Sequence, residues 1–495
     1  MRIIYATSDL PSWINVAQNM QSIKNWDPIY WVTTPKNKLV VQEAFPDAIC
    51  QGYIDAVRGE YTYIEYTQED IVLDKNILEQ YASYEKTAIK MMDRMDPTAY
   101  AFNITERTQL YYEFLQYWLN TIKVLRPEGV LFTESPHGLF QYILYAVCQE
   151  NNIKIIRYVP THINGLTFLS SFIEHTPGYL ENVYEIYLNG NEDGVFQLSN
   201  DYLEKNRSSY KEALPYYMRT LTKQYSILQT SKVYLGKIKR LLKTDIVTAY
   251  KKGNHYALSQ VGTKFDLIIY RIKGFFVKRK LQKVYDNFAI FADLTKPYIY
   301  VALHYQPEKT SSPEAGVFVD QWLMINMLSS TVLSDWTIYV KEHSSQFSNK
   351  LYGEQGRRSD FYEKVRALKN VNLINRHTNS FDLIDNAKAI ATLTGTVGLE
   401  SVIRSKPVFC FGYAWYEKCH GVMKVSTSME LKKYLEDIQK DYMVDSRKVD
   451  AFLHAIEAVS FPTYLNPGNK AGVTFDEEEN INNLTACLLQ YVDKV

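Results

Sequence analysis

Short apolar runs alternate with longer amphipathic segments near the N-terminus. Residues 2–6, 28–33, 129–133 and 153–159 read as buried strands, and residues 136–151 as a helix that opens at Pro136. Residues 106–125 carry a further helical pattern. A strand–helix–strand order implies parallel strands joined by a right-handed crossover. The N-terminal part of the chain is therefore predicted to contain a parallel sheet.

The same alternation is clearer in the C-terminal part. Five strands are predicted at residues 298–303, 336–341, 371–374, 387–393 and 407–411. The helices between and after them are predicted at residues 317–333, 360–368, 380–386, 397–404, 429–442 and 446–459. Residues 477–492 form a last amphipathic helix whose first turn is acidic, as the helix dipole favours. This pattern predicts a second, Rossmann-like sheet.

Residues 200–290 lack this alternation and are basic. From Lys232 to Lys283 the chain has fourteen Lys or Arg residues against two acidic ones, with apolar residues between them. A basic amphipathic segment of this kind is suited to an anionic membrane surface. The alternative is a solvated helical insert whose charge is balanced elsewhere. Nucleic-acid binding is not expected, because no recognition motif accompanies the charge.

We therefore expect an α/β protein of the GT-B type, with two Rossmann-like domains facing a central cleft and a basic helical insert between them. The expected parts are an N-terminal domain (1–200), the insert (201–290) and a C-terminal domain (291–475). The last helix (476–495) is expected to pack back on the N-terminal domain. An active site would lie at the carboxyl ends of both sheets.

Composition narrows the classes of protein. The 495 residues have a formal net charge of zero, which argues against a globally basic nucleic-acid binder. The five cysteines are widely spaced and form no metal-binding pattern, as in a cytoplasmic protein with free thiols. No stretch approaches the roughly 18–20 apolar residues that span a bilayer. Any membrane association is expected to be peripheral.

The turn at Thr394-Gly395-Thr396 has the most informative chemistry. A strand ends there and a helix begins, so free N–H groups and two hydroxyls would form a seat for a phosphate group. Glu400, one turn into the helix, would reach a ribose hydroxyl. The alternative is simple capping of the helix by Thr396.

Three other predicted strands in this half also end in polar residues. Lys341 and His343 follow one strand and would neutralise phosphate. The other candidates for the cleft, at the ends of two further strands, are His304, Gln306, Glu308 and His377. Because parallel strands present their carboxyl ends at one edge of a sheet, these groups are predicted to converge on a polar cleft.

The N-terminal half has a similar placement. Glu134 ends a strand and His137 is expected in the first turn of the following helix, where the pair would act as nucleophile, base or acid. The alternative is a capping residue beside a structural histidine. Arg157, His162 and Asn164 follow the next strand and would contact an acceptor or an anionic sugar.

These C-terminal segments together resemble the capsule-polysaccharide glycosyltransferase family that includes the bacterial β-Kdo transferases. The resemblance lies in the runs YVALHYQPE from Tyr300, YVKEH from Tyr339, TGTVGLE from Thr394 and KPVFCFG from Lys406, with Trp415-Tyr416. Two family features differ. A Lys-Pro-His-Pro-like strand end is Lys341-Glu342-His343-Ser344 here, and no Glu-Asp-Gly signature follows the strand at 153–159.

The resemblance implies a GT-B enzyme on the cytoplasmic membrane face that uses CMP-activated 2-keto sugar acids and needs no metal. It implies that Lys341, His343, Thr394, Thr396 and Glu400 hold CMP, and that His304 and Glu308 line the donor site. Residues 291–475 would then be the nucleotide-sugar-binding domain and residues 1–200 the acceptor and catalytic domain. Retaining members use an N-domain carboxylate, for which Glu134 is the candidate here. The acceptor would be a glycan or a lipid-linked glycan. Two alternatives stay open: a CDP-glycerol or CDP-ribitol polymer transferase, and a non-catalytic scaffold for glycan assembly.

Overall fold

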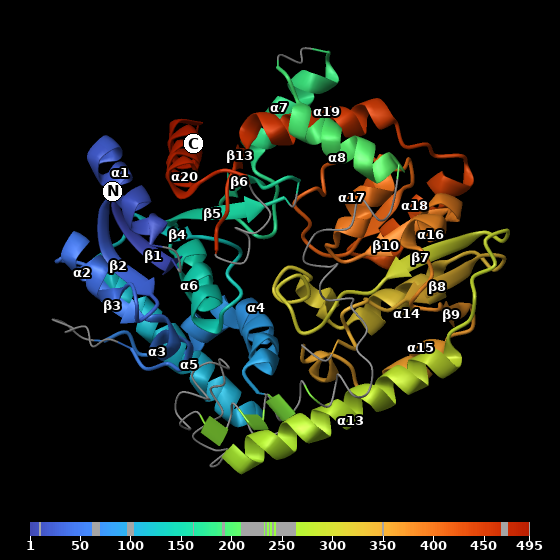
Figure 1. Ribbon diagram of the computed structural model, residues 1–495, viewed down its shortest axis with the longest axis horizontal. Helices are drawn as coiled ribbons and strands as arrows, with labels where there is room; N and C mark the ends of the chain where they lie inside the picture. The colour runs from blue at the N-terminus through green and yellow to red at the C-terminus, as the bar shows by residue number, and fades with distance from the viewer. Residues whose placement is uncertain are drawn as a thin grey trace. The chain divides into compact units, whose positions relative to one another are not determined.

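The computed structural model contains two compact units, each built around its own sheet (Figure 1). It describes residues 1–8, 11–61, 70–96, 103–161, 163–190, 194–208, 264–348, 351–466 and 474–494, with a few single positions between 232 and 243. Of these, unit 1 contains the residues up to Ile173 and from Val459 onward, and unit 2 contains the rest.

Unit 1 has a seven-stranded sheet in the order β13-β6-β5-β4-β1-β2-β3. The strands from β5 to β3 run parallel, whereas β6 and β13 are antiparallel to their neighbours. The order from β3 to β6 reverses direction between β1 and β4, which makes that point the topological switch. The strands are β1 (Arg2–Ser8), β2 (Asp27–Thr33), β3 (Ile49–Gly52), β4 (Gly129–Phe132), β5 (Lys154–Pro160), β6 (Leu166–Ser170) and β13 (Phe461–Pro462).

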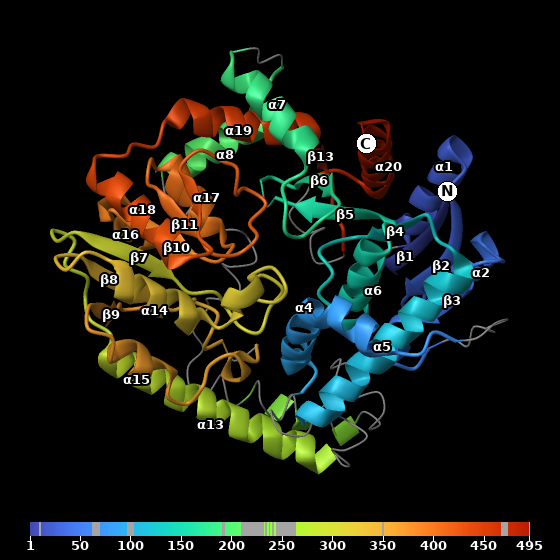
Figure 2. The same cartoon turned by 180° about the vertical axis from the view of Figure 1, so that it is seen from behind.

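The central strands of unit 1 are buried along nearly their whole length, as expected where helices cover both faces of a parallel sheet. Among these helices, α4, α5 and α6 pack against one another (Figure 2). The helices are α1 (Ser12–Lys24), α2 (Lys38–Ala44), α3 (Tyr53–Val57), α4 (Lys75–Met91), η1 (Met92–Arg94), α5 (Ile104–Leu125), α6 (Leu139–Glu150) and α20 (Glu477–Lys494).

The C-terminal helix α20 belongs to unit 1, where it packs against α1. The buried Tyr158 hydroxyl of β5 donates to the Leu484 carbonyl of α20 at 2.8 Å, and the Asn19 amide of α1 donates to Thr485 at 3.2 Å. Leu488 of α20 is fully buried. The last helix therefore completes the core of the N-terminal sheet.

Unit 2 has a six-stranded, entirely parallel sheet in the order β12-β11-β10-β7-β8-β9. Counted from its own first strand, this is the Rossmann order 3-2-1-4-5-6, with the switch between β7 and β10. The strands are β7 (Tyr298–Ala302), β8 (Thr337–Lys341), β9 (Val371–Leu373), β10 (Ala389–Thr392), β11 (Val408–Cys410) and β12 (Val422–Lys424).

One face of this sheet packs a single hydrophobic cluster beneath α13, α14, α15 and α18. Helix α17 lies outside that cluster and packs against α8. The elements are α7 (Gly178–Leu188), α8 (Gln197–Ser208), α13 (Lys264–Phe288), η3 (Gly316–Val319), α14 (Gln321–Thr331), η4 (Gly353–Gln355), α15 (Phe361–Arg366), α16 (Ser380–Asn386), α17 (Thr396–Ile403), α18 (Ser428–Gln439) and α19 (Ser446–Val459).

The fold class expected from the sequence, two Rossmann-like parallel sheets, is confirmed. The expected boundary at residue 200 differs from the structure, because α7 and α8 belong to unit 2 and the division falls after Ile173. Most of the basic insert at 201–290 lies outside the described residues. Its last part is α13.

Two helices begin later than the sequence pattern predicts. The helix expected from Pro136 starts at Leu139, because the Gln141 side chain accepts the Gly138 N–H and caps the helix there. The helix expected at 317–333 is split, since the Asp320 carboxylate accepts the Trp322 N–H and starts α14 as a separate helix after η3.

The contribution of α20 is testable. We expect Leu488→Ala to lower the free energy of unfolding of unit 1 by about 2–5 kcal/mol, because it leaves a cavity where α20 meets the sheet. Leu39→Ala in α2 is the matched control, since Leu39 is 70% exposed. Urea unfolding of both variants measures the difference. Equal stabilities would mean that α20 does not support this core.

Candidate functional site

The polar strand ends of unit 2 are neighbours in the sheet. Strands β10, β7, β8 and β9 are adjacent and parallel, so the segments that follow them lie along one edge. The switch between β7 and β10 is where open α/β sheets bind ligands. We call residues 304–308, 341–343 and 394–396 the rim. The sequence-based expectation that these segments share one sheet edge is therefore met by the strand order.

His304 and Thr394 bridge the switch point. The Thr394 N–H donates to His304 Nε2 at 3.1 Å, and both residues are buried. The Thr394 hydroxyl donates to the Thr310 carbonyl at 3.1 Å. A Cβ atom on Gly395 would lie 3.0 Å from His304 Cε1, so glycine allows this turn to lie against the imidazole.

Helix α17 begins directly at the rim. Gly395 is its N-cap, and no side chain of the described residues caps it. Thr396 is the first helical residue rather than the cap, and its hydroxyl donates to Glu400 Oε1 at 2.9 Å. The Tyr416 hydroxyl donates to the Gly395 carbonyl and fixes the turn. The first N–H groups of α17 therefore offer a seat for an anion.

Both rim histidines are electrically neutral near pH 7. Burial, with His343 and Arg357 nearby, lowers the pKa of His304 to about 3. Burial is also the main cause that lowers the pKa of His343 to about 4. The Ser345 N–H donates to His343 Nδ1 at 3.2 Å. His343 therefore does not supply the positive charge that the sequence suggested for it, and His304 is neutral as well.

Lys341 supplies charge at the rim. Its ammonium donates to the Thr378 carbonyl at 2.6 Å and to the Ser380 hydroxyl at 2.8 Å. Burial lowers the pKa of Lys341 to about 8, so this ammonium group is protonated in most molecules at pH 7. Burial raises the pKa of Glu400, and the hydrogen bond from Thr396 and the nearby charge of Lys341 offset part of this rise.

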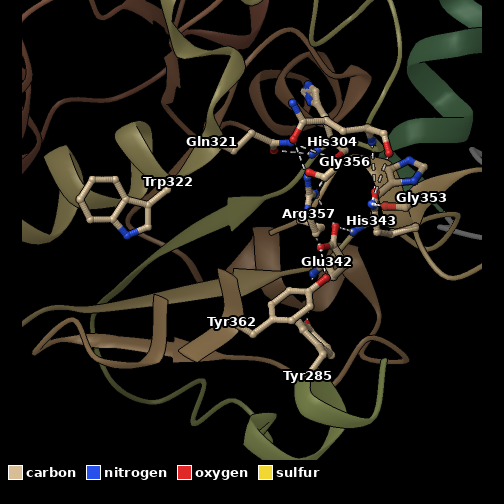
Figure 3. A network of polar contacts seen from close by, with 12 residues as sticks. Tyr285, His304, Gln321, Trp322, Glu342, His343, Gly353, Gly356, Arg357 and Tyr362 are labelled. Carbon is tan, nitrogen blue, oxygen red and sulfur yellow. Dashed lines mark hydrogen bonds and ion pairs between the residues drawn. The ribbon is translucent and has the colours of Figure 1, made fainter. Parts of the chain in front are cut away.

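Glu342 of the rim forms a buried ion pair with Arg357 (Figure 3). Arg357 donates from Nε to Glu342 Oε2 and from Nη2 to Glu342 Oε1, both at 2.9 Å, and neither side chain has any exposed surface. The Tyr362 hydroxyl donates to Glu342 Oε2 at 2.6 Å. The Tyr285 hydroxyl accepts the Glu342 N–H at 3.1 Å. The pair ties β8 to the segment after η4.

The remaining candidates in unit 2 have different environments. Gln306 is buried, and its side chain accepts from Arg357 Nη1 and donates to the Val319 carbonyl, so it holds the loop together. Glu308 is exposed and accepts from Thr310 at 3.0 Å. His377 is exposed, and its main-chain N–H donates to the Asn375 side chain. Gln306 therefore joins the hydrogen-bond network of Arg357 and Glu342.

In unit 1, Glu134 and His137 follow β4 at the switch point. Both are half-buried. His137 lies in the turn before α6 rather than in its first turn, because the helix starts at Leu139. Its Nδ1 is 2.9 Å from the Ser135 carbonyl, and its own carbonyl accepts from Arg94 at 2.7 Å. Among the described residues, Glu134 places a carboxylate at this switch point.

Of the three acceptor candidates, two lie within the described part of unit 1. Arg157 is buried on β5 and donates to Ser135 Oγ at 2.9 Å and to the Phe172 carbonyl at 2.6 Å. Asn164 lies exposed in the turn between β5 and β6 with φ of 46°. His162 lies outside the described residues.

Sequence reasoning missed Arg357, Glu342 and Gln321. Gln321 exchanges hydrogen bonds with the main chain of His304, at 2.8 and 3.0 Å. Gly353 and Gly356 are the sequence signal that could have indicated this loop. A Cβ atom on Gly353 would collide with the Gln346 main chain, and one on Gly356 with the Gln306 main chain. Close backbone approach at two glycines points to a tightly held loop.

Among the described residues, no group of three or more His, Cys, Asp and Glu side chains is arranged to hold a metal ion. No helix in that part of the chain is long and apolar enough to cross a membrane.

Comparisons with solved structures return loose matches. A UDP-GlcNAc 2-epimerase from Methanocaldococcus jannaschii is similar at 11% identity and a TM-score of 0.26, over 93% of this chain and 99% of that chain. KpsC, a β-Kdo 2,7 transferase from Thermosulfurimonas dismutans, is similar at 13% identity and a TM-score of 0.28, over 74% of this chain and 88% of that chain. These matches assign no activity to this chain. The comparison with curated proteins returned no match.

One family model matches the chain, that of the capsule polysaccharide biosynthesis proteins, over residues 321–442. This segment includes β8 to β12, the Glu342–Arg357 pair and the start of α17. The resemblance noted in the sequence is confirmed there. Residues 321–442 are thus similar to the capsule polysaccharide biosynthesis proteins.

Proposed function

We propose that this protein is a glycosyltransferase of capsule synthesis that moves a Kdo-like or nonulosonic 2-keto sugar acid from a CMP donor to a glycan or lipid-linked glycan. The observation that carries the proposal is the rim at the β7/β10 switch, within and beside the capsule-biosynthesis domain. There the uncapped start of α17 lies next to the His304–Thr394 contact.

The charge of the rim suits a nucleoside monophosphate. A helix N-terminus carries about half a positive charge. Lys341 adds one ammonium group, whereas His304 and His343 stay neutral. In the proposal these groups hold the phosphate of CMP, and Glu400 accepts from a ribose hydroxyl. The same groups stabilise the negative charge that develops as CMP departs.

Glu134 is the proposed catalytic carboxylate. It follows β4 at the switch point of unit 1 and is half-buried, which suits a nucleophile in a retaining reaction or a general base. His137 orients the acceptor beside it in this proposal. In this proposal Arg157 does not contact the acceptor, because its guanidinium donates hydrogen bonds to the Ser135 hydroxyl and the Phe172 carbonyl.

The proposed location is the cytoplasmic face of the membrane. Most of the basic segment at 232–283 lies outside the described residues, but α13 presents part of it. Ile272, Phe276 and Val277 are 41%, 64% and 43% exposed, and Lys273 and Lys280 are exposed beside them. Apolar side chains flanked by lysines favour an anionic lipid surface.

The first prediction concerns the turn before α17. We expect Gly395→Ala to weaken CMP binding by about tenfold, because the added methyl group must displace the His304 ring or the turn. Gly178→Ala is the matched control, since a Cβ there meets nothing within 4 Å. Isothermal titration calorimetry with CMP measures both. Unchanged affinity in Gly395→Ala would argue against a phosphate at this turn.

The second prediction concerns pH. The lowered pKa of Lys341, about 8, means that its charge is present at pH 7 and is lost as the pH rises through 8. CMP affinity should therefore fall between pH 7 and pH 9. Lys341→Met should lower the affinity at pH 7 by at least about tenfold and remove this pH dependence.

Lys433→Met, on the exposed side of α18, is the control and should retain both the affinity and the fall. A Lys341→Met variant that keeps the wild-type pH profile would remove Lys341 from the phosphate site.

The third prediction tests the reaction itself. CMP release from CMP-Kdo, CMP-sialic acid and CDP-glycerol is measured with a glycan acceptor present. We expect turnover with a CMP-sugar acid, and a loss of at least about 100-fold in Glu134→Gln with CMP affinity retained. Glu43→Gln, an exposed carboxylate of α2, should turn over normally.

Turnover with CDP-glycerol alone would favour a polymer transferase. CMP binding without turnover of any donor would favour a scaffold. Full activity of Glu134→Gln would remove the catalytic assignment.

A further inference from the structure

Each rim histidine has one ring nitrogen that accepts a main-chain N–H. His304 Nε2 accepts from Thr394 at 3.1 Å, and His343 Nδ1 accepts from Ser345 at 3.2 Å. A ring nitrogen that accepts a hydrogen bond carries no proton. The proton of the neutral ring is therefore on Nδ1 of His304 and on Nε2 of His343.

The two remaining ring N–H groups are available to a ligand. Among the described residues, neither His304 Nδ1 nor His343 Nε2 has a hydrogen-bond acceptor. Neither nitrogen is among the fully buried polar atoms that lack a partner. His343 is half-buried and His304 is 6% exposed, and the two residues follow the adjacent strands β7 and β8.

The Glu342–Arg357 ion pair holds the main chain of both histidines. Glu342 Oε1 accepts the His343 N–H at 2.8 Å, and Arg357 Nη2 donates to the His304 carbonyl at 2.8 Å (Figure 3). Because the carboxylate and the guanidinium are themselves joined by two hydrogen bonds of 2.9 Å, the two histidines are linked through a single rigid pair.

We propose that Arg357 and Glu342 are positioning residues, which fix His304 and His343 as two neutral imidazole N–H donors for the phosphate group of the bound nucleotide. This inference rests on the proposed function for the identity of the ligand. It assigns the pair a role in setting the spacing and the tautomers of the donors, with no contact of its own to the nucleotide.

The charges around each ring support a neutral donor. His304 faces Arg357 and His343, which together with burial disfavour its protonation and lower its pKa. Burial likewise lowers the pKa of His343, which faces Arg357, Lys341 and Glu342, and of these only Glu342 favours protonation. A neutral ring keeps its accepting nitrogen free of a proton, so the main-chain N–H contacts persist at physiological pH.

The variant that tests the pair replaces both charges together. Removing only one partner leaves an uncompensated charge in the interior, so Arg357→Met alone is expected to fold poorly. The double variant Glu342→Leu with Arg357→Met leaves no such charge. The matched control is Arg207→Met with Asp450→Leu, which removes an ion pair between α8 and α19 in the same unit.

Two measurements separate positioning from a general structural effect. Ring ¹⁵N signals in the chain, which has nine histidines, report the tautomer and pKa of His304 and His343. In the wild-type and control proteins we expect protons on His304 Nδ1 and His343 Nε2, with no titration from pH 5.5 to 8. In the folded double variant we expect both rings to stay neutral, since their burial persists, but to carry the proton on either nitrogen, because the main-chain contacts that fix the tautomers are no longer held.

CMP affinity is the second measurement, and we expect at least a tenfold loss in the double variant (~1.4 kcal/mol per factor of ten) and none in the control. Titration of the two wild-type rings between pH 5.5 and 8 would overturn the inference. So would wild-type CMP affinity in the double variant. A wild-type chain that binds no CMP would instead overturn the proposed function, while the ring signals would still report the tautomers.

Discussion

A guanidinium without exposed surface needs an acceptor for each of its N–H groups, and this requirement organises the rim of unit 2. Arg357 meets it with both oxygens of Glu342, the side chain of Gln306 and the carbonyls of His304 and Gly356. These acceptors come from the ends of two strands and from the loop that carries Arg357. Losing one partner of a buried pair costs about 3–5 kcal/mol, so these segments cannot shift independently.

Helix α13 extends this constraint to the surface of unit 2. Lys278 is buried, donates to the Ser348 and Leu351 carbonyls and pairs with Glu354 at 3.1 Å. A Cβ atom on Gly274 would lie 2.6 Å from Glu354 Oε1, so glycine lets this loop lie close to the helix. The loop is thus held at Glu354 by Lys278 of α13 and at Arg357 by Glu342. A binding site on such a support is preorganised rather than assembled by the ligand.

The sequence predicted the sheets and the strand ends well because both follow from local patterns. Buried parallel strands appear as continuous apolar runs, and polar residues just after them must lie at one edge. Arg357 could not be found in this way. Its acceptors in Glu342, Gln306 and His304 are 15, 51 and 53 residues away, and the loop around it has no periodic pattern. Nor does the sequence show that the imidazoles are neutral, because burial and the nearby guanidinium decide that.

This neutrality changes what the rim can recognise. Imidazolium groups would attract any anion strongly and would do so only at low pH. Neutral N–H donors in fixed positions contribute direction more than charge, and they leave Lys341 and the start of α17 to balance the negative charge of a ligand. A helix end and one ammonium together balance little more than one negative charge, which fits the single phosphate group of the proposed CMP donor. In the proposed reaction, weak charge with strict geometry suits a nucleotide that leaves after transfer rather than one that stays bound.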